Sequence, residues 1–219
     1  MKFKSLNILL IFNILLLSIS LVLKKSNNNI LYGKVIVIDP GHGGNDNGAE
    51  VNNVLEDEIN LNIAKLLYQK LFDQGCIVHI TRVGDYDLAP QDSQTRKMKD
   101  LKRRTRFINE VDADLFISIH INIFIQEQVK GIQVFYQQYK DESKKLAKSL
   151  QNEFNRLINE KNKKPKIGDY YILNNTYPTG VLIECGFLSN DEDRLNLNNH
   201  DYQDKICKII YKGILDFYR

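Results

Sequence analysis

The stretch Lys34-Val-Ile-Val-Ile-Asp39, followed by Pro40-Gly-His-Gly-Gly44, decides the fold of this 219-residue chain. A continuous run of β-branched residues, without polar alternation, is typical of a strand that is buried on both faces. The proline and the glycines behind it allow a tight turn that a larger residue would obstruct. Strands of this kind occur in parallel sheets with helices on both sides, so the segment predicts an α/β fold.

The chain beyond this turn alternates between strand and helix patterns. A helix is expected over residues 58–73, where apolar residues recur at helical spacing and Gly75 follows the end. Further strands are expected at 76–82, 114–120, 131–136, 171–173 and 181–184, and further helices at 97–109, 141–158 and 201–218. This order predicts a single-domain, three-layer α/β sandwich with a mostly parallel central sheet flanked by helices.

The N-terminal segment predicts export. Lys2 and Lys4 precede a mostly apolar run at 6–23, and no Ala-x-Ala-like cleavage site follows it. The run is about long enough to span a thin bilayer, which favours an uncleaved signal anchor over a cleaved signal peptide in residues 1–25. Residues 26–32 are then a linker and 33–219 the functional domain, which we expect outside the cytoplasm, anchored to the membrane or secreted.

Charge and cysteine content argue against two classes of protein. The net charge is +3, but residues 1–25 hold 4 of the 30 basic side chains and none of the 27 acidic ones, so the rest carries −1. A nearly neutral domain gives no reason to expect nucleic acid as a partner. Cys76, Cys185 and Cys207 cannot all pair, and their spacing matches no Cys-rich zinc motif, so a disulfide scaffold is not expected.

Three of the expected strands lead into residues that could bind a metal or transfer a proton. His42 follows the first strand, while His120 and Glu184 end two later ones. In open α/β sheets, sites form beyond the carboxyl ends of the strands. Each residue also has a structural interpretation, since a histidine after a strand is often a hydrogen-bonded loop residue and Glu184 could make an ion pair. Their combination at strand ends favours a site.

A hydrolytic zinc ion needs three protein ligands and one open position, and imidazole and carboxylate are both suitable. Glu56 could complete the set, because the hairpin-like stretch 45–54 brings it back toward His42. Glu58 is its rival from spacing alone. Glu184 would then exchange protons between a water molecule and the leaving nitrogen, so the expected reaction is metal-assisted hydrolysis of an amide.

The chain resembles the zinc-dependent N-acetylmuramoyl-L-alanine amidases of the Amidase_3 type. Four motifs carry the resemblance: Ile38-Asp-Pro-Gly-His-Gly-Gly-Asn-Asp-Asn-Gly-Ala49, Glu56-Asp-Glu-Ile-Asn-Leu61, Ser118-Ile-His-Ile-Asn122 and Val181-Leu-Ile-Glu-Cys-Gly-Phe-Leu-Ser-Asn190. It implies that His42, Glu56 and His120 bind Zn²⁺ and that Glu184 is catalytic, which favours Glu56 over Glu58. The implied substrate is peptidoglycan, cut between N-acetylmuramic acid and the L-alanine of the stem peptide.

A narrower resemblance concerns Thr81-Arg-Val-Gly-Asp-Tyr-Asp-Leu-Ala-Pro90 and Thr95-Arg-Lys-Met-Lys-Asp-Leu-Lys-Arg-Arg104. Both are similar to segments of the germination-specific amidases of endospore-forming bacteria. This implies removal of stem peptides from the spore cortex, a step toward muramic-δ-lactam and germination, in the space between the forespore membranes. No wall-binding repeats and no long insertion after His120 are seen, so an activating protein partner is expected.

Two other functions remain compatible with the residues. A zinc peptidase acting within the stem peptide could use the same metal site, although the motif at 181–190 resembles amidases. A catalytically silent cell-wall or partner-binding protein would be expected to lack a ligand or the base, whereas all four candidates are present.

Overall fold

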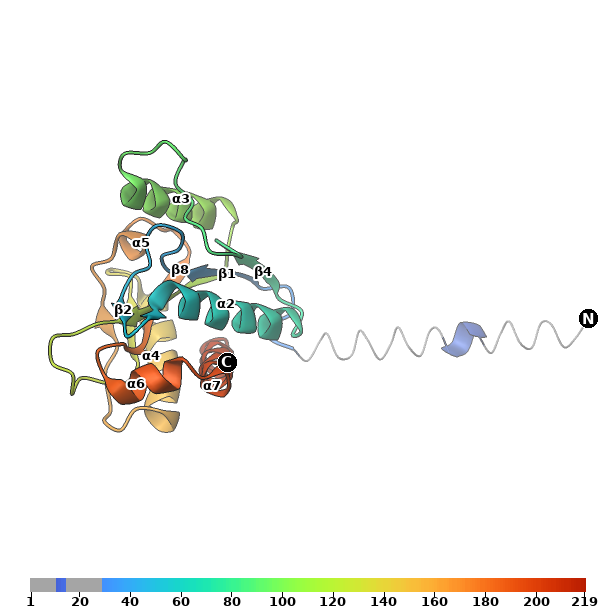
Figure 1. Cartoon of the computed structure of the whole chain (residues 1–219). Coiled ribbons are helices and arrows are strands. Elements are labelled where there is room, and N and C mark those ends of the chain that lie inside the picture. Colours follow the sequence, from blue (N-terminus) through green and yellow to red (C-terminus); the bar gives the residue numbers. More distant parts are fainter. Residues whose placement is uncertain (1–10, 15–28) are drawn as a thin grey trace, which may run out of the picture.

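A six-stranded sheet occupies the centre of this computed structural model, which describes residues 11–14 and 29–219 (Figure 1). The strand order is β4-β1-β5-β8-β6-β7. The first four are parallel to one another, β6 is antiparallel to β8, and β7 is parallel to β6. The strands are β1 (Val35–Pro40), β4 (Ile77–Ile80), β5 (Leu115–Asn122), β6 (Gln133–Tyr136), β7 (Lys166–Ile167) and β8 (Thr179–Phe187). The predicted mostly parallel sheet is confirmed.

Helices cover both faces of this sheet (Figure 1). One face carries α2 (Glu56–Phe72), α4 (Asp141–Leu157) and α7 (His200–Phe217), with the short α6 (Asp191–Leu197) beside α7. The opposite face carries α3 (Arg96–Glu110) and α5 (Tyr171–Asn174). The arrangement is the predicted three-layer α/β sandwich.

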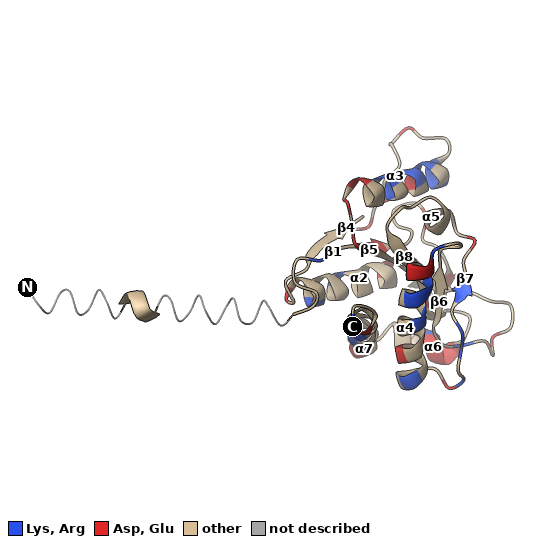
Figure 2. Ribbon diagram, turned by 180° about the vertical axis from the view of Figure 1, so that it is seen from behind, with Lys and Arg blue, Asp and Glu red and all other residues tan. Residues whose placement is uncertain are grey.

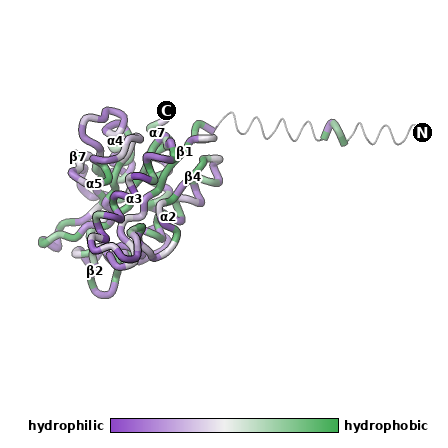
Figure 3. The backbone as a smooth tube through the Cα atoms, turned by 90° about the horizontal axis from the view of Figure 1, so that it is seen from above, coloured by the Kyte–Doolittle hydropathy of each residue, from purple (hydrophilic) through white to green (hydrophobic). Residues whose placement is uncertain are grey.

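Each face of the sheet has its own hydrophobic core, because successive residues of a strand point to opposite faces. In β1, Ile36 and Ile38 belong to the larger core under α2, α4 and α7. Val37 belongs to the smaller core, with Phe116 and Leu182 of the neighbouring strands. Both sets are fully or almost fully buried, and Figure 3 shows hydrophobic stretches running through the middle of the folded part. Burial on both faces explains why β1 reads as a continuous apolar run.

The structure differs from the sequence predictions in several elements. Residues 171–173 were predicted as a strand, which is wrong: they begin the helix α5. The helix expected from residue 58 begins at Glu56 instead. The hairpin-like stretch before it forms the two-stranded sheet β2 (Glu50–Val51) and β3 (Val54–Leu55). The sequence did not predict α6 or β7.

The N-terminal predictions fall largely outside the described residues. The expected signal anchor or signal peptide, residues 1–25, is described only at 11–14, and the linker prediction for 26–32 only from Asn29. Leu31 is fully buried in the larger core, and the Asn29 side chain donates a hydrogen bond to the Gln74 carbonyl at 2.6 Å. Residues 29–32 therefore pack as part of the folded domain. In the described part of the chain, no helix is both long and apolar enough to span a bilayer.

The three cysteines are buried and form no disulfide, as predicted from their number and spacing. Burial raises the pKa of the Cys76 thiol to about 11 and that of Cys207 to about 12. A thiol in such surroundings stays protonated and packs as a small apolar side chain.

Candidate metal and catalytic site

The candidate site lies at the carboxyl ends of the parallel strands. His120 of β5 and Glu184 of β8 are direct neighbours in the sheet ladder. His120 lies four positions after Phe116, and Glu184 lies two positions after Leu182. Residues separated by an even number of positions in a strand point to the same face, which here is the face covered by α3 and α5. The strand register thus brings together two residues that are 64 positions apart in the sequence.

His42, Glu56 and His120 form a cluster that could hold a metal ion. Each offers one ligand atom, and these atoms lie within 4.8 Å of one another. The Glu56 Oε1 atom is 3.3 Å from His42 Nε2 and 3.0 Å from His120 Nδ1. Two imidazoles and one carboxylate are a ligand set that suits a catalytic zinc ion and leaves a position for substrate or water. The residues therefore fit the implied metal.

Backbone donors fix the carboxylate of Glu56 in this cluster. The Ala49 amide donates to Oε2 at 2.8 Å, and the Ile121 amide donates to Oε1 at 3.0 Å. Burial alone would raise the pKa of Glu56, but the hydrogen bonds and charges of His120 and His42 hold that pKa well below its usual range. The Glu58 side chain is exposed on α2. The structure thus brings Glu56, and not Glu58, to the histidines.

His42 is held in a conformation that few residues with a side chain adopt. Its backbone φ is 61°, in the left-handed region. Its Nδ1 atom lies 3.1 Å from the Asp46 carboxylate, so Nε2 is the ring nitrogen that could bind a metal ion. Burial would lower the pKa of His42, but Glu56 and then Asp46 outweigh it and raise that pKa. A carboxylate behind a histidine ligand orients the ring and makes it a better donor.

Two buried arginines, which the sequence analysis did not single out, hold the turn that carries His42. The Arg104 guanidinium donates to the carbonyls of Pro40 and His42, both at 2.6 Å. Arg82 donates to the carbonyls of Pro40 at 3.1 Å and Gly41 at 2.9 Å. Both side chains are almost completely buried. They satisfy three consecutive backbone carbonyls and so fix the path of the turn.

Arg104 also pairs with Asp39, at 2.9 Å between Nη1 and Oδ1. Thr81 and Ser118 donate hydroxyl hydrogen bonds to the same carboxylate at 2.7 and 2.8 Å. Burial would raise the pKa of Asp39, but Arg104 and then the two hydroxyls lower it. Asp39 is therefore a buried ion-pair partner near the end of β1. Figure 2 shows that Lys and Arg colour much of α3, the helix that supplies Arg104.

Glu184 is a buried acid next to the candidate metal-binding cluster. Its side chain is 6% exposed, and Tyr170 donates a hydrogen bond to its Oε1 atom at 3.3 Å. Burial raises the pKa of Glu184 to about 7, with His120 opposing and Glu56 adding to the shift. A carboxyl group whose pKa is near neutrality can both accept and donate a proton.

Gly41 is required because the His120 ring passes against it. A Cβ atom built on Gly41 would lie 2.2–2.6 Å from three atoms of that imidazole. We expect Gly41→Ala to displace the ring and weaken zinc binding by about tenfold or more, measured by competition with a chelating dye. Gly84→Ala is the matched control, because its Cβ would meet only the Tyr86 side chain, at 3.2 Å. Equal zinc affinity of the two variants would contradict this role of Gly41.

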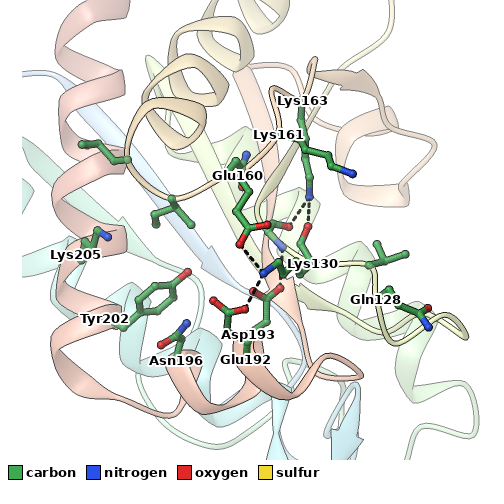
Figure 4. Close-up of a pocket in the computed structure, with 15 residues that line it drawn as sticks. Gln128, Lys130, Glu160, Lys161, Lys163, Glu192, Asp193, Asn196, Tyr202 and Lys205 are labelled. Atoms are coloured by element: carbon green, nitrogen blue, oxygen red, sulfur yellow. Dashed lines mark hydrogen bonds and ion pairs between the residues drawn. The ribbon is translucent and has the colours of Figure 1, made fainter.

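A separate cavity of about 420 Å³ lies away from this cluster, between the loops after β5 and α4 and the helices α6 and α7 (Figure 4). Its charged groups are largely paired: Lys130 binds Glu160 and Glu192, both at 2.7 Å. Lys163 donates to the carbonyls of Lys130 and Gly131. Lys163, one lysine of the charged run 161–166, is thus held by the backbone of the neighbouring loop.

Comparisons with known proteins find a matching family model, similar curated relatives and similar solved structures. The sequence model described as N-acetylmuramoyl-L-alanine amidase matches residues 36–216. The germination-specific N-acetylmuramoyl-L-alanine amidase of Bacillus subtilis (strain 168) is 41% identical over 192 residues, which cover 86% of this chain and 81% of that protein. The CwlD amidase from Clostridioides difficile, solved in complex with the GerS lipoprotein, gives a TM-score of 0.81 at 37% identity, covering 84% of this chain and 98% of that chain. An N-acetylmuramoyl-L-alanine amidase from Clostridium difficile 630 gives 0.76 at 30% identity, covering 84% and 96%.

Proposed function

This chain belongs to the N-acetylmuramoyl-L-alanine amidase family, and from that premise we propose that it hydrolyses, with zinc, the amide bond between N-acetylmuramic acid and L-alanine in peptidoglycan. One observation carries the proposal beyond family membership: His42, Glu56 and His120 converge beside the buried Glu184 at one edge of the sheet. All four residues that the chemistry requires are present and adjacent. This arrangement argues against a catalytically silent binding protein, and the three relatives described above are named as amidases, not as peptidases acting within the stem.

The residues divide the reaction between them. When bound, zinc polarises the scissile carbonyl and makes a water molecule more acidic. Glu184 accepts the proton of the attacking water and donates it to the leaving nitrogen of L-alanine, so the C–N bond breaks with a neutral amine as product. His42, Glu56 and His120 hold the metal, and Asp46 orients the ring of His42.

The substrate we propose is the peptidoglycan of the spore cortex. The germination-specific relative from Bacillus subtilis is 41% identical over most of this chain. Release of the stem peptide leaves a bare muramic acid residue, which is the starting point for muramic-δ-lactam. The enzyme would thus act before germination, while the cortex is being made.

Two further features support a proposed place of action and a proposed partner. The basic and apolar N-terminal segment supports a position outside the cytoplasm, anchored to the membrane or secreted. The similar CwlD amidase from Clostridioides difficile is bound to the GerS lipoprotein. We therefore extend the proposal to an activating protein partner at the membrane surface.

Removal of the metal tests the proposed chemistry. Dialysis against a strong chelator is expected to abolish release of stem peptides, and about one equivalent of zinc per chain is expected to restore it, because a His-Glu-His site leaves one open position for the reaction. Magnesium should not restore activity, since it prefers oxygen ligands. Chromatography of released peptides provides the measurement. Undiminished activity of the metal-free protein would refute the proposal.

A further inference from the structure

We propose that Tyr170 is a positioning residue for Glu184, and that its hydroxyl holds one carboxylate oxygen so that the other carries the proton. The inference rests on the proposed function and assigns a role to a residue outside the four sequence motifs. Tyr170 stands 14 positions before Glu184 in the chain, at the N-cap of the short helix α5.

The hydrogen bonds of the Glu184 carboxylate are unequal. The Tyr170 hydroxyl donates to Oε1 at 3.3 Å. Oε2 is buried and has no hydrogen-bond partner within the described part of the chain. Burying a carboxylate oxygen without a hydrogen-bond donor destabilises the folded protein, so such an atom calls for a functional explanation. Exchange of a proton with the reacting groups is such an explanation. The two oxygens of Glu184 therefore have different tasks.

Packing fixes the ring of Tyr170 behind this hydrogen bond. Its ring meets that of Phe135 edge to face, with 5.2 Å between the centroids and 73° between the planes. Gly168 also packs closely against both side chains. A Cβ atom built on Gly168 would lie 2.8 Å from Tyr170 Cδ2 and 3.0 Å from Phe135 Cβ, so only glycine fits there. The Gly168 amide donates to the Tyr136 carbonyl at 3.0 Å, which ties this turn to β6. The Tyr170 hydroxyl is thus held in place by a tightly packed segment.

A short helix anchors the same segment in the smaller core. Ile172 and Leu173 of α5 are 4% and 2% exposed and pack with Val37 and Phe116. The helix cannot move without disturbing this core, so Tyr170 keeps its distance from β8. Proton transfer depends steeply on the distance and direction between the groups, so a base fixed in one orientation reacts faster than one that rotates.

Tyr170→Phe separates this role from packing, because it removes the hydroxyl and keeps the ring. With the full-length, zinc-loaded protein, we expect kcat for stem-peptide release to fall by about tenfold, the effect of losing a hydrogen bond to a charged group. KM, zinc affinity and the midpoint of thermal unfolding should stay unchanged. Tyr171→Phe is the matched control, since the adjacent tyrosine makes no side-chain hydrogen bond to the described residues, and it should retain the wild-type kcat.

The outcomes are distinguishable from failure of the proposed function. If the wild-type protein releases no stem peptides, the amidase proposal itself fails. If the wild type is active and Tyr170→Phe matches it in kcat, the positioning role of Tyr170 is refuted. A loss of zinc affinity in Tyr170→Phe would also overturn it, because the residue would then act on the metal site and not on the base.

Discussion

Replacing Glu184 with glutamine is expected to lower kcat for stem-peptide release by about 10³-fold, the range of a lost general acid–base catalyst. Glutamine has nearly the same shape and can still accept the hydrogen bond from Tyr170, but its amide cannot take up a proton. Zinc content should remain the same, because Glu184 is not among the residues that converge on Glu56 Oε1. Steady-state kinetics on purified peptidoglycan, with metal analysis of the same samples, provides the measurement.

Glu58→Gln is the control for this substitution. Glu58 is the alternative that the sequence spacing allowed, and its side chain is exposed on α2. It should therefore behave as wild type in both rate and metal content. A Glu184→Gln variant that retains more than about a tenth of the wild-type kcat would exclude Glu184 as the proton carrier.

Arg104→Met is expected to destabilise the fold by about 3–5 kcal/mol, the usual cost of removing one partner from a buried ion pair. The substitution leaves the Asp39 carboxylate buried without its cation and removes the donors to the carbonyls of Pro40 and His42. Because those carbonyls belong to the turn that presents His42, zinc affinity should fall as well. Urea unfolding and zinc titration measure the two effects.

A conservative variant and an exposed arginine complete this test. Arg104→Lys keeps the charge near Asp39 but cannot reach the two carbonyls with a planar fork, so an intermediate loss is expected. Arg106, on the same helix, pairs with Glu110 at 2.7 Å and is highly exposed. Arg106→Met should leave unfolding and zinc affinity unchanged. If Arg104→Met is as stable as Arg106→Met, the turn does not depend on the buried cation.

The sheet and the strand-end residues could be predicted from sequence because their signals are local. The β-branched run in β1 reports burial on both faces, and the carboxyl ends of parallel strands necessarily lie along one edge. Once the strands were placed, His42, His120 and Glu184 had to come near one another. The structure brings them to that edge without any further assumption.

The start of α2 could not be read from the sequence. Its N-cap is Leu55, whose side chain makes no capping hydrogen bond, so the usual signal of Ser, Thr, Asp or Asn is missing. The β2–β3 hairpin, not a cap, fixes the position of Glu56. Residues 171–173 were predicted as a strand because aromatic and β-branched residues favour strands. In the fold they form a helix, which buries Ile172 and Leu173 against the sheet.

The buried arginines and Tyr170 carry no local signal of their role. Charged side chains are mostly exposed, so Arg82 and Arg104 read as surface residues until the fold shows their carbonyl partners. Arg104 does have Asp100 four positions earlier, at 2.7 Å, but such pairs are common on exposed helices. Tyr170 meets Glu184 only through the packing of α5 on β8, which depends on contacts across the whole smaller core.

Mass spectrometry of the products from a defined muropeptide tests the assignment most directly. The zinc-loaded protein should release the intact stem peptide with L-alanine at its free N-terminus, and leave muramic acid with an unsubstituted lactyl carboxylate. The Glu184→Gln variant should release neither at an appreciable rate. Fragments cut within the stem peptide, with L-alanine still attached to muramic acid, would contradict the amidase assignment and show that the same site serves a peptidase.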